Sequence, residues 1–456
     1  MGKPTDITLK EISTATRSYV YRQPMKFGGR VVDSATLLHC QATVVGAHGR
    51  KKTVGIGEMP VGTSWAWPSK IPGALTQKIL LELVERLAAA VSNQNISGDP
   101  LEITHQIAAY REKIADELTK ERNLPEPIPK LAVMMVASPI EAAIHDAFGR
   151  SVGKNSFEIM TSEYLNRDLG AYLGDDFAQM YPDRFLSPKP KATMPLYHLV
   201  GALDPLTMAD VKQRVNDGLP ETLDEWIKTD GLSHLKIKLA GNDLDWDVGR
   251  IVEVNRVAEL VSSDRKWKYS LDFNEQCPNE DYVLDLFERI DRLSNASFER
   301  VQYIEQPTPR DLSQRTDMTV HRIARLRPIV IDESLTDLQS LLLARQRGYT
   351  GIALKACKGQ SECLLMGAAG AHYKMFVCVQ DLTCIGGSFL HSAAVASRLP
   401  TVAGIEGNGR QYCPVGNDPY MKDYAPMFRV RYGTIPTELL DGPGLGFKWQ
   451  PFQADA

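Results

Sequence analysis

From residue 194 onward, short apolar strands alternate with helical segments, and this alternation constrains the fold more than any other feature of the sequence. Eight strands are predicted here, at 194–200, 234–239, 268–273, 301–306, 328–333, 351–356, 375–380 and 401–406. The segments between them, for example 247–261 and 280–293, carry apolar residues at helical spacing. Eight strands that alternate with helices predict an α/β fold, a (β/α)8 barrel of the TIM type.

The first 150 residues are organised differently. Three β-rich runs at 8–21, 34–45 and 51–60 are separated by turns and predict an antiparallel meander. Helical periodicity follows at 74–94 and 140–155, whereas residues 161–192 contain several prolines and predict a long connection. We therefore predict an α+β capping domain over 1–190, completed by the C-terminal segment 426–456, and a barrel domain over 191–425.

Composition disfavours several classes of partner. The 456 residues carry a formal net charge of −4 with Lys and Arg scattered, so we expect neither a nucleic-acid nor a membrane surface. The sequence contains no run of 18 apolar residues, so no transmembrane helix is predicted. The seven cysteines are dispersed and form no CxxC pair, which favours reduced thiols and a cytoplasmic location over a disulfide framework or a zinc site.

Ionisable residues stand at the carboxyl ends of the predicted strands, where TIM barrels place their chemistry. In chain order they are Lys236, Lys238, Asp272, Glu305, Asp332, Glu333, Lys355, Asp381 and Glu406. Three carboxylates from consecutive strands, Asp272, Glu305 and Asp332, would repel one another unless a cation lies among them. Mg²⁺ prefers such hard oxygen ligands, with Mn²⁺ as an alternative. The alternative for Asp272 and Asp332 is that each caps the N-terminus of the following helix, which is the usual role of Asp at a turn from strand to helix.

Lysines flank these carboxylates in chain order. Lys236 and Lys238 share one face of their strand because side chains alternate, and an ammonium group beside Lys238 lowers the pKa of Lys238 toward that of a usable base. A divalent ion that binds a substrate carboxylate stabilises the enediolate left when the α-proton departs. Lys238 on one side and Lys355 on the other would then remove and return that proton.

These residues form motifs that resemble the enolase superfamily, specifically its muconate-lactonizing-enzyme-like branch. The motifs are "KIK" at 236–238, "D-x-N" at Asp272 and Asn274, "EQP" at Glu305, "DES" at Asp332 and "LKxxK" at Lys355 and Lys358. The branch includes dipeptide epimerases, muconate cycloisomerases and o-succinylbenzoate synthases. The resemblance implies an Mg²⁺-dependent enzyme, with Asp272, Glu305 and Asp332 as metal ligands and Lys238 and Lys355 as the acid/base pair. It also implies a small carboxylate substrate and a homo-oligomer.

Some residues differ from the motifs of related enzymes, and these differences restrict which reaction we expect. Strand 7 carries no His and strand 6 carries Lys355, which disfavours the mandelate-racemase-like branch. Dipeptide epimerases hold the substrate ammonium with Asp-x-Asp on strand 8, where this chain has Glu406 and Asn408. We expect racemisation or epimerisation of an amino-acid-like or dipeptide-like substrate. Cycloisomerisation, acid-sugar dehydration and a non-catalytic barrel that binds a carboxylate stay open.

Further residues are candidates for contacts around the reacting groups or the substrate: Asn274, Glu333, Asp381, Glu406, Asn408, Lys26 and His198. Two cap loops, 21–29 and 61–69, are expected to close over the barrel and select the substrate. Lys26 and Arg22 in the first loop are candidates for contact with an anionic tail, with a solvated loop as the alternative. The alternative for His198 is a histidine of the core. Trp65 and Trp67 can instead be part of ordinary loop packing. Lys358 is expected to be a solvated residue or a partner at the start of a helix.

Overall fold

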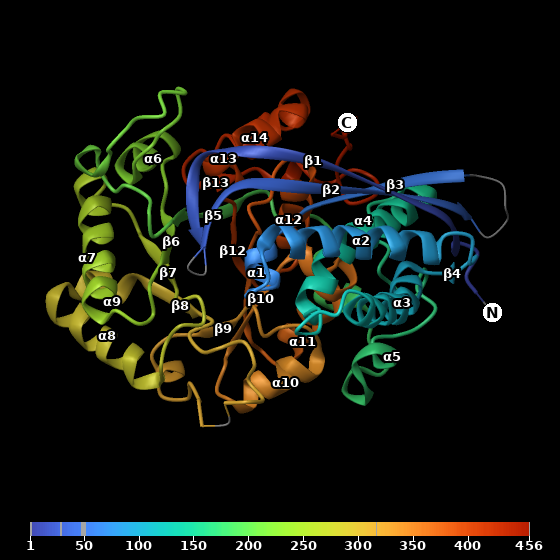
Figure 1. The fold of residues 1–456 in the computed structure, drawn as a ribbon, viewed down its shortest axis with the longest axis horizontal. Coiled ribbons are helices and arrows are strands. Elements are labelled where there is room, and N and C mark those ends of the chain that lie inside the picture. The colour runs from blue at the N-terminus through green and yellow to red at the C-terminus, as the bar shows by residue number, and fades with distance from the viewer. Residues whose placement is uncertain (1, 28–29, 47–51, 316, 456) are drawn as a thin grey trace.

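The computed structural model of this chain describes residues 2–27, 30–46, 52–315 and 317–455. It contains a closed parallel barrel and a separate antiparallel sheet that is covered by helices (Figure 1). This architecture confirms the predicted fold class, a TIM-type barrel with an α+β cap.

Eight parallel strands form the barrel, one for each predicted strand. They are β5 (Met194–Val200), β6 (His234–Lys238), β7 (Lys268–Asp272), β8 (Val301–Glu305), β9 (Ile329–Ile331), β10 (Gly351–Leu354), β11 (Phe376–Val379) and β12 (Val402–Glu406). Neighbours in sequence are neighbours in the sheet, and β12 pairs with β5 to close the barrel. A ninth short strand, β13 (Thr434–Ile435), pairs antiparallel with β5.

Helices connect most of the barrel strands. They are α6 (Leu223–Asp230), α7 (Leu244–Val261), α8 (Glu280–Leu293), α9 (Asn295–Arg300), α10 (Leu338–Gln346), α11 (Gln360–His372) and α12 (Gly387–Arg398). Two further helices, α13 (Gly409–Tyr412) and α14 (Met421–Phe428), follow the last barrel strand. The predicted alternation differs at one connection, because the described residues between β8 and β9 form only a 3-10 turn, Ile323–Arg325. Pro307 and Pro309 at the start of that connection disfavour a helix there.

The antiparallel sheet has the strand order β3-β2-β1-β4. Its strands are β1 (Ile7–Phe27), β2 (Arg30–Gly46), β3 (Lys52–Pro60) and β4 (Ser97–Gly98). Two helices, α1 (Thr63–Ala66) and α2 (Gly73–Val91), lie between β3 and β4 in the chain, and α3 (Pro100–Glu121) and α4 (Lys130–Val152) follow β4. The first three strands are the predicted meander. Figure 1 shows β1 and β2, in blue, reaching from this sheet toward the barrel.

Helix α4 is the central element of the cap. A Cβ atom at Gly55 would lie 2.1 Å from the carbonyl oxygen of Ala143, and one at Gly57 would lie 2.1 Å from that of Pro139. Only glycine therefore lets β3 approach the helix backbone this closely. By length and composition α4 is also the one described helix apolar enough to cross a membrane, but its apolar window is fully buried within the protein.

The segment 161–192 forms mostly irregular structure, with the short helices α5 (Gly170–Leu173), η1 (Asp175–Phe177) and η2 (Pro182–Phe185). Its end is fastened to the barrel, since the Ser187 and Lys191 backbone N–H groups donate to the carbonyls of Arg398 and Ser397. The chain's C-terminal part returns to the cap, where the Leu445 N–H donates to Asp146 of α4 over 3.0 Å.

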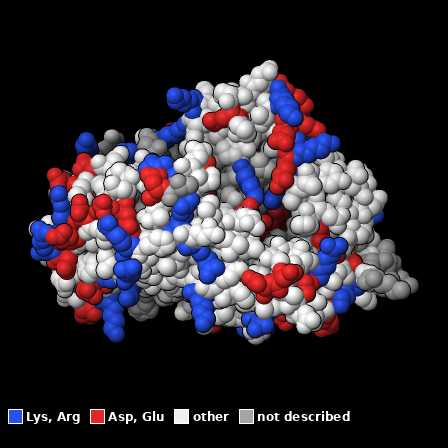
Figure 2. Space-filling view, turned by 90° about the horizontal axis from the view of Figure 1, so that it is seen from below, with Lys and Arg blue, Asp and Glu red and all other residues white. Residues whose placement is uncertain are grey.

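Charges on the surface are mixed. On the face that Figure 2 shows, Lys and Arg side chains are interspersed with Asp and Glu side chains, and no broad area carries one sign. This face therefore provides no concentrated field that would attract one charged macromolecule.

Asp99 gives a pH-dependent prediction for the stability of the cap. It is the N-cap of α3 and fully buried, and its carboxylate accepts from the Glu102 N–H and the Asn166 N–H over 3.0 and 2.8 Å. Burial, with the nearby carboxylates of Glu102 and Asp6, raises the pKa of Asp99 to about 6. Between pH 4 and 6 the folded state therefore binds more protons than the unfolded state, so the free energy of unfolding falls as pH rises.

We expect Asp99→Asn to remove that part of the slope, which amounts to at most about 3 kcal/mol for a shift of about two pKa units. Urea unfolding of both proteins from pH 4 to 7 measures it. Asp243→Asn, at the exposed N-cap of α7, is the matched control. Parallel stability curves for the wild type and Asp99→Asn would contradict the prediction.

Candidate active site

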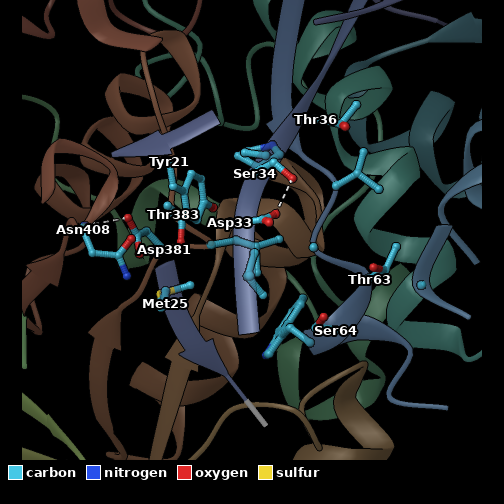
Figure 3. A pocket seen from close by; sticks show the side chains of 18 of the residues that line it. Tyr21, Met25, Asp33, Ser34, Thr36, Thr63, Ser64, Asp381, Thr383 and Asn408 are labelled. Carbon is cyan, nitrogen blue, oxygen red and sulfur yellow. Dashed lines mark hydrogen bonds between the residues drawn. The ribbon is translucent and has the colours of Figure 1, made fainter. Parts of the chain in front are cut away.

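A cavity of about 340 Å³ lies between the cap and the carboxyl ends of the barrel strands. The cap contributes residues of β1, β2 and α1, and the barrel contributes residues at or just beyond the ends of β5, β6, β10, β11 and β12. Figure 3 shows Asp381, Thr383 and Asn408 on one side of this cavity and Thr63 and Ser64 of α1 on the other. Five of the predicted strand-end residues line this space below the cap, namely Lys236, Lys238, Lys355, Asp381 and Glu406. Asp272, Glu305 and Asp332 do not line it themselves but contact the lysines that do.

Strand register places Lys238, Asp272 and Glu305 side by side. Lys238 on β6 pairs with Asp272 on β7, which pairs with Glu305 on β8. The Lys238 ammonium contacts Asp272 Oδ2 and donates to Asn274 Oδ1 over 3.1 Å. Asn274 also donates its backbone N–H to Asp272 Oδ1, so it supports this pair from the following turn.

Lys236 lies below this row and is almost fully buried, with 2% of its surface exposed. Its ammonium group lies 2.9 Å from both Glu305 and Glu406 and 3.1 Å from Asp272. Burial alone would lower the pKa of Lys236, but these three carboxylates raise it well above its usual value. Lys236 therefore acts here as the cation that neutralises three strand-end carboxylates, and it shares Asp272 Oδ2 with Lys238.

Asp332 is held by groups from both domains. Its carboxylate lies 2.7 Å from the Lys355 ammonium and 3.2 Å from that of Lys358, and the Trp65 indole N–H donates to it over 3.3 Å. Burial opposes ionisation, yet the two lysines lower the pKa of Asp332 to about 2. The interpretation of Lys358 as a solvated residue is wrong, because it is 3% exposed and also donates to the Asp332 carbonyl.

Trp65 is the cap residue that closes over these groups. Its ring centroid lies 4.7 Å from the Lys355 ammonium and 5.8 Å from that of Lys358, a cation–π geometry. Arg310, beyond β8, donates to the Trp65 carbonyl over 3.0 Å and fastens α1 to the barrel. Ordinary loop packing does not describe this residue, because it contacts the predicted base and a predicted metal ligand.

The charges at this end of the barrel do not balance. The buried ionisable side chains are six carboxylates and four lysines, namely Asp272, Glu305, Asp332, Glu333, Asp381, Glu406, Lys236, Lys238, Lys355 and Lys358. Burial and the neighbouring Asp272 carboxylate raise the pKa of Glu305 to about 8, and burial and Asp332 raise that of Glu333 well above its usual value. Two excess negative charges in a buried site favour either bound protons or a divalent cation.

The carboxylate oxygens of Asp272, Glu305 and Asp332 are ligands that suit Mg²⁺, although lysine ammonium groups contact these oxygens in this structure. Three carboxylates at the ends of consecutive strands supply hard oxygen atoms, and Asp332 Oδ1 lies 3.2 Å from the Lys358 ammonium. Among the described residues no group of three or more His, Cys, Asp or Glu side chains already surrounds a common point. A cation at Asp272, Glu305 and Asp332 therefore requires the ammonium groups of Lys236, Lys238 and Lys355 to move away from them.

The ends of β11 and β12 complete the cavity wall. Asp381 Oδ2 accepts from the backbone N–H groups of Asn408 and Cys384 over 3.1 and 3.3 Å, and the Asn408 amide donates to Glu406 over 3.3 Å. Between Asp381 and Cys384 the chain turns through Thr383, whose φ of 52° is unusual for a β-branched residue. Strain of this kind concentrates at functional sites.

Four of the predicted contact residues do not line the cavity: Asn274, described above beside Lys238, and Lys26, His198 and Glu333. Lys26 is exposed on β1, pairs across the sheet with Val31, and does not line the cavity. His198 is buried on β5, where its two ring nitrogens contact Arg410 and Gln411 at 2.9 and 3.2 Å, as a core histidine does. Glu333 is buried beside Asp332 but also lies outside the cavity lining.

Arg22 fastens the cap to the barrel instead of facing an anion. Its guanidinium forms a bidentate pair with Asp217 and donates to the Pro220 carbonyl over 3.0 Å. The expected substrate loop 21–29 is thus anchored at Arg22, while Gly28 and Gly29 at its tip lie outside the described residues. Gln380 was not expected at the site, yet its amide donates to Glu305; its position directly after β11 was the available signal.

Comparison with known proteins gives a family and a fold. The sequence profile described as "Enolase C-terminal domain-like" matches residues 218–453, more than half of the chain. No curated protein matches the chain.

Three solved structures illustrate the shared fold. An enolase from Bradyrhizobium complexed with magnesium and mandelic acid is 18% identical, with a TM-score of 0.60, and the alignment covers 97% of this chain and 96% of that one. A muconate lactonizing enzyme from Pseudomonas fluorescens complexed with muconolactone is 17% identical, with a TM-score of 0.59 and coverage of 96% and 95%. The L-Ala-D/L-Glu epimerase from Bacillus subtilis is 16% identical, with a TM-score of 0.61 and coverage of 97% and 99%.

These solved structures share the barrel and the cap over nearly their whole length, and the profile match extends from the connection before α6 into the C-terminal segment. The motifs "KIK", "D-x-N", "EQP", "DES" and "LKxxK" all lie within the matched residues. The resemblance predicted from those motifs is therefore confirmed, and the chain belongs to the Enolase C-terminal domain-like family.

Proposed function

We propose that this protein abstracts a proton α to a carboxylate in an Mg²⁺-dependent reaction and thereby racemises or epimerises an amino-acid-like or dipeptide-like substrate. The observation that carries the proposal is the placement of two lysines. Lys238 on β6 and Lys355 after β10 both line the same cavity and flank the carboxylates of Asp272, Glu305 and Asp332. Amines on two sides of one substrate permit proton removal from one face and return to the other.

The chain's own residues have distinct roles in this reaction. Asp272, Glu305 and Asp332 would hold the ion, and a bound Mg²⁺ would stabilise the enediolate charge on the substrate carboxylate. Asp332 raises the pKa of Lys355 in the present arrangement despite its burial, so this ion pair must open before Lys355 accepts a proton. Trp65 covers Lys355 and excludes water from its ammonium group.

Solvent exchange tests the proposal directly. The protein is incubated in D₂O with a set of α-amino acids, dipeptides and other small carboxylates, and deuterium at the α-carbon is followed by proton NMR. We expect exchange with Mg²⁺, a loss of at least about 100-fold in excess EDTA, and recovery when Mg²⁺ is restored. Appearance of the opposite configuration identifies racemisation, whereas loss of water identifies dehydration.

Two outcomes would contradict the proposal. Exchange that persists in EDTA would remove the role of the ion. A protein that exchanges no carboxylate in the set and shows no heat of Mg²⁺ binding in calorimetry would instead be a non-catalytic barrel.

A further inference from the structure

The helix that follows the predicted base Lys355 begins without a cap of its own. α11 starts directly after the turn η5 (Ala356–Lys358), and its N-cap residue is Gly359, which has no side chain to accept a hydrogen bond. Backbone N–H groups in the first turn of a helix lack partners within the helix and need them from elsewhere. Here the cap supplies one, because the Ser361 N–H donates to Glu141 Oε2 of α4 over 3.3 Å.

Glu141 is held from two sides. Its side chain is buried, and its other oxygen, Oε1, accepts from the Arg111 guanidinium of α3 over 3.0 Å. A Cβ atom at Gly359 would lie 2.4 Å from Oε2, so the carboxylate packs directly against the backbone of this glycine. Gly359 also has a φ of 117°, a value that residues with side chains rarely adopt. The position therefore needs glycine both for its backbone conformation and for the approach of the carboxylate.

The first two residues of α11 make further buried contacts. The Ser361 hydroxyl lies 2.7 Å from that of Thr104 on α3 and 2.9 Å from His145 Nε2 on α4. The Gln360 amide oxygen lies 2.8 Å from His391 Nε2 on α12. All five side chains are buried, and hydrogen bonds between buried groups are costly to break. The start of α11 therefore has one preferred position against the cap.

A single tight turn connects this anchored segment to Lys355. The Lys358 N–H donates to the Lys355 carbonyl over 2.9 Å, and the Gly359 N–H donates to that of Ala356 over 3.1 Å. Only these turn residues separate Lys355, which lines the cavity, from the glycine that Glu141 contacts. A displacement of the glycine is therefore passed on to the lysine, because so short a hydrogen-bonded turn cannot absorb it.

We propose that Glu141 is a positioning residue for Lys355. The inference rests on the proposed function, in which Lys355 transfers a proton on one face of the substrate. Glu141 is not among the described residues that line the cavity, so it acts on the substrate through the lysine. Proton transfer depends steeply on the placement of the amine, and a shift of about 1 Å in a supporting segment can cost about 100-fold in rate.

The two enantiomers of one exchanging substrate, in D₂O with Mg²⁺ present, test the proposal. Glu141→Gln keeps the shape of the side chain but replaces one acceptor by an amide NH₂ group. The charge of Arg111 draws the amide oxygen toward itself, which leaves the NH₂ group against the Ser361 N–H, donor against donor. For the enantiomer that Lys355→Ala no longer exchanges, we expect kcat to fall at least about tenfold and KM to change less than about threefold. The other enantiomer should exchange nearly as in the wild type.

Two further variants separate this role from the loss of a buried ion pair. In the double variant Arg111→Met, Glu141→Gln the amide oxygen is free to accept from Ser361, so kcat for the affected enantiomer should recover to within about threefold of the wild type. Gly359→Ala disturbs the same contact from the barrel side. It should lower exchange of the same enantiomer, and it decides the point if Glu141→Gln does not fold.

The cap offers a matched control for each contact. Asp146→Asn alters another buried carboxylate of α4, which accepts from the backbone N–H groups of Ile56 and Leu445. Gly98→Ala, on β4, adds a Cβ atom 2.5 Å from the Glu102 carboxylate at a φ of 146°. Both controls should leave the ratio of the two enantiomers' exchange rates unchanged.

Each outcome decides a different point. A selective loss that matches Lys355→Ala, with recovery in the double variant, supports the assignment. Equal loss of both enantiomers in Glu141→Gln and Gly359→Ala, or an unchanged ratio in both, would overturn it and leave the proposed function intact. Absence of exchange by the wild type with every carboxylate in the set would overturn the proposed function and this inference together.

Discussion

Lys238→Ala and Lys355→Ala are each expected to abolish racemisation, lowering the rate by about 10²- to 10⁴-fold, the usual contribution of a general acid or base. Both lysines line one cavity and stand on opposite flanks of the strand-end carboxylates, so each faces a different side of a substrate held there. A racemisation needs both, because one removes the proton and the other returns it.

Exchange experiments separate this role from a structural one. Each variant should still exchange the α-proton of one enantiomer, the one whose proton faces the remaining lysine, and the two variants should retain opposite enantiomers. A defect in folding or in metal binding would reduce exchange of both enantiomers equally. Proton NMR in D₂O with each pure enantiomer measures the effect.

Lys268→Ala is the matched control for these variants. Lys268 also lies on a barrel strand, but at the amino end of β7, and its side chain is exposed.

A positive charge at position 355 is not sufficient for activity. Lys355→Arg is therefore expected to be inactive, because arginine stays protonated and cannot accept a proton. If Lys238→Ala and Lys355→Ala retain racemisation, or lose exchange of the same enantiomer, the two-base assignment is wrong.

Strand positions were predictable because short apolar runs that alternate with helical segments have few other solutions. The same pattern also identified the strand-end residues, since the carboxyl ends of parallel strands meet at one side of a barrel. The connection between β8 and β9 shows the limit of the pattern. There the spacing of strands suggests a helix, while the local prolines and the turn at Ile323–Arg325 produce a different link.

Contacts between side chains were less predictable than positions. The ammonium group of Lys236 reaches Glu406, which is 170 residues away, and no spacing rule identifies that partner. Trp65 depends on how the cap packs on the barrel, which is set by contacts such as those of Arg310 and Arg22 and not by local sequence. His198 points away from the cavity toward α6, where it contacts Trp226, and Arg410 and Gln411 occupy its two nitrogens.

Lys236 connects the stability of the barrel to its chemistry. Its ammonium group is the shared cation of Glu305, Glu406 and Asp272, and all four side chains are buried. We expect Lys236→Met to lower the free energy of unfolding by about 3–5 kcal/mol without added metal, because removing one member of a buried ionic cluster leaves the others uncompensated. Chemical denaturation in EDTA measures this loss.

Added Mg²⁺ should restore more stability to Lys236→Met than to the wild type. In the variant no Lys236 ammonium competes for Asp272 and Glu305, so the ion binds more tightly to the folded state and stabilises it by mass action. Lys191→Met is the matched control, because Lys191 donates to the Val402 carbonyl and to no carboxylate, and its response to Mg²⁺ should match that of the wild type. Equal Mg²⁺ responses in all three proteins would show that these carboxylates do not hold the ion, since the lysine that contacts them would then have no influence on its binding.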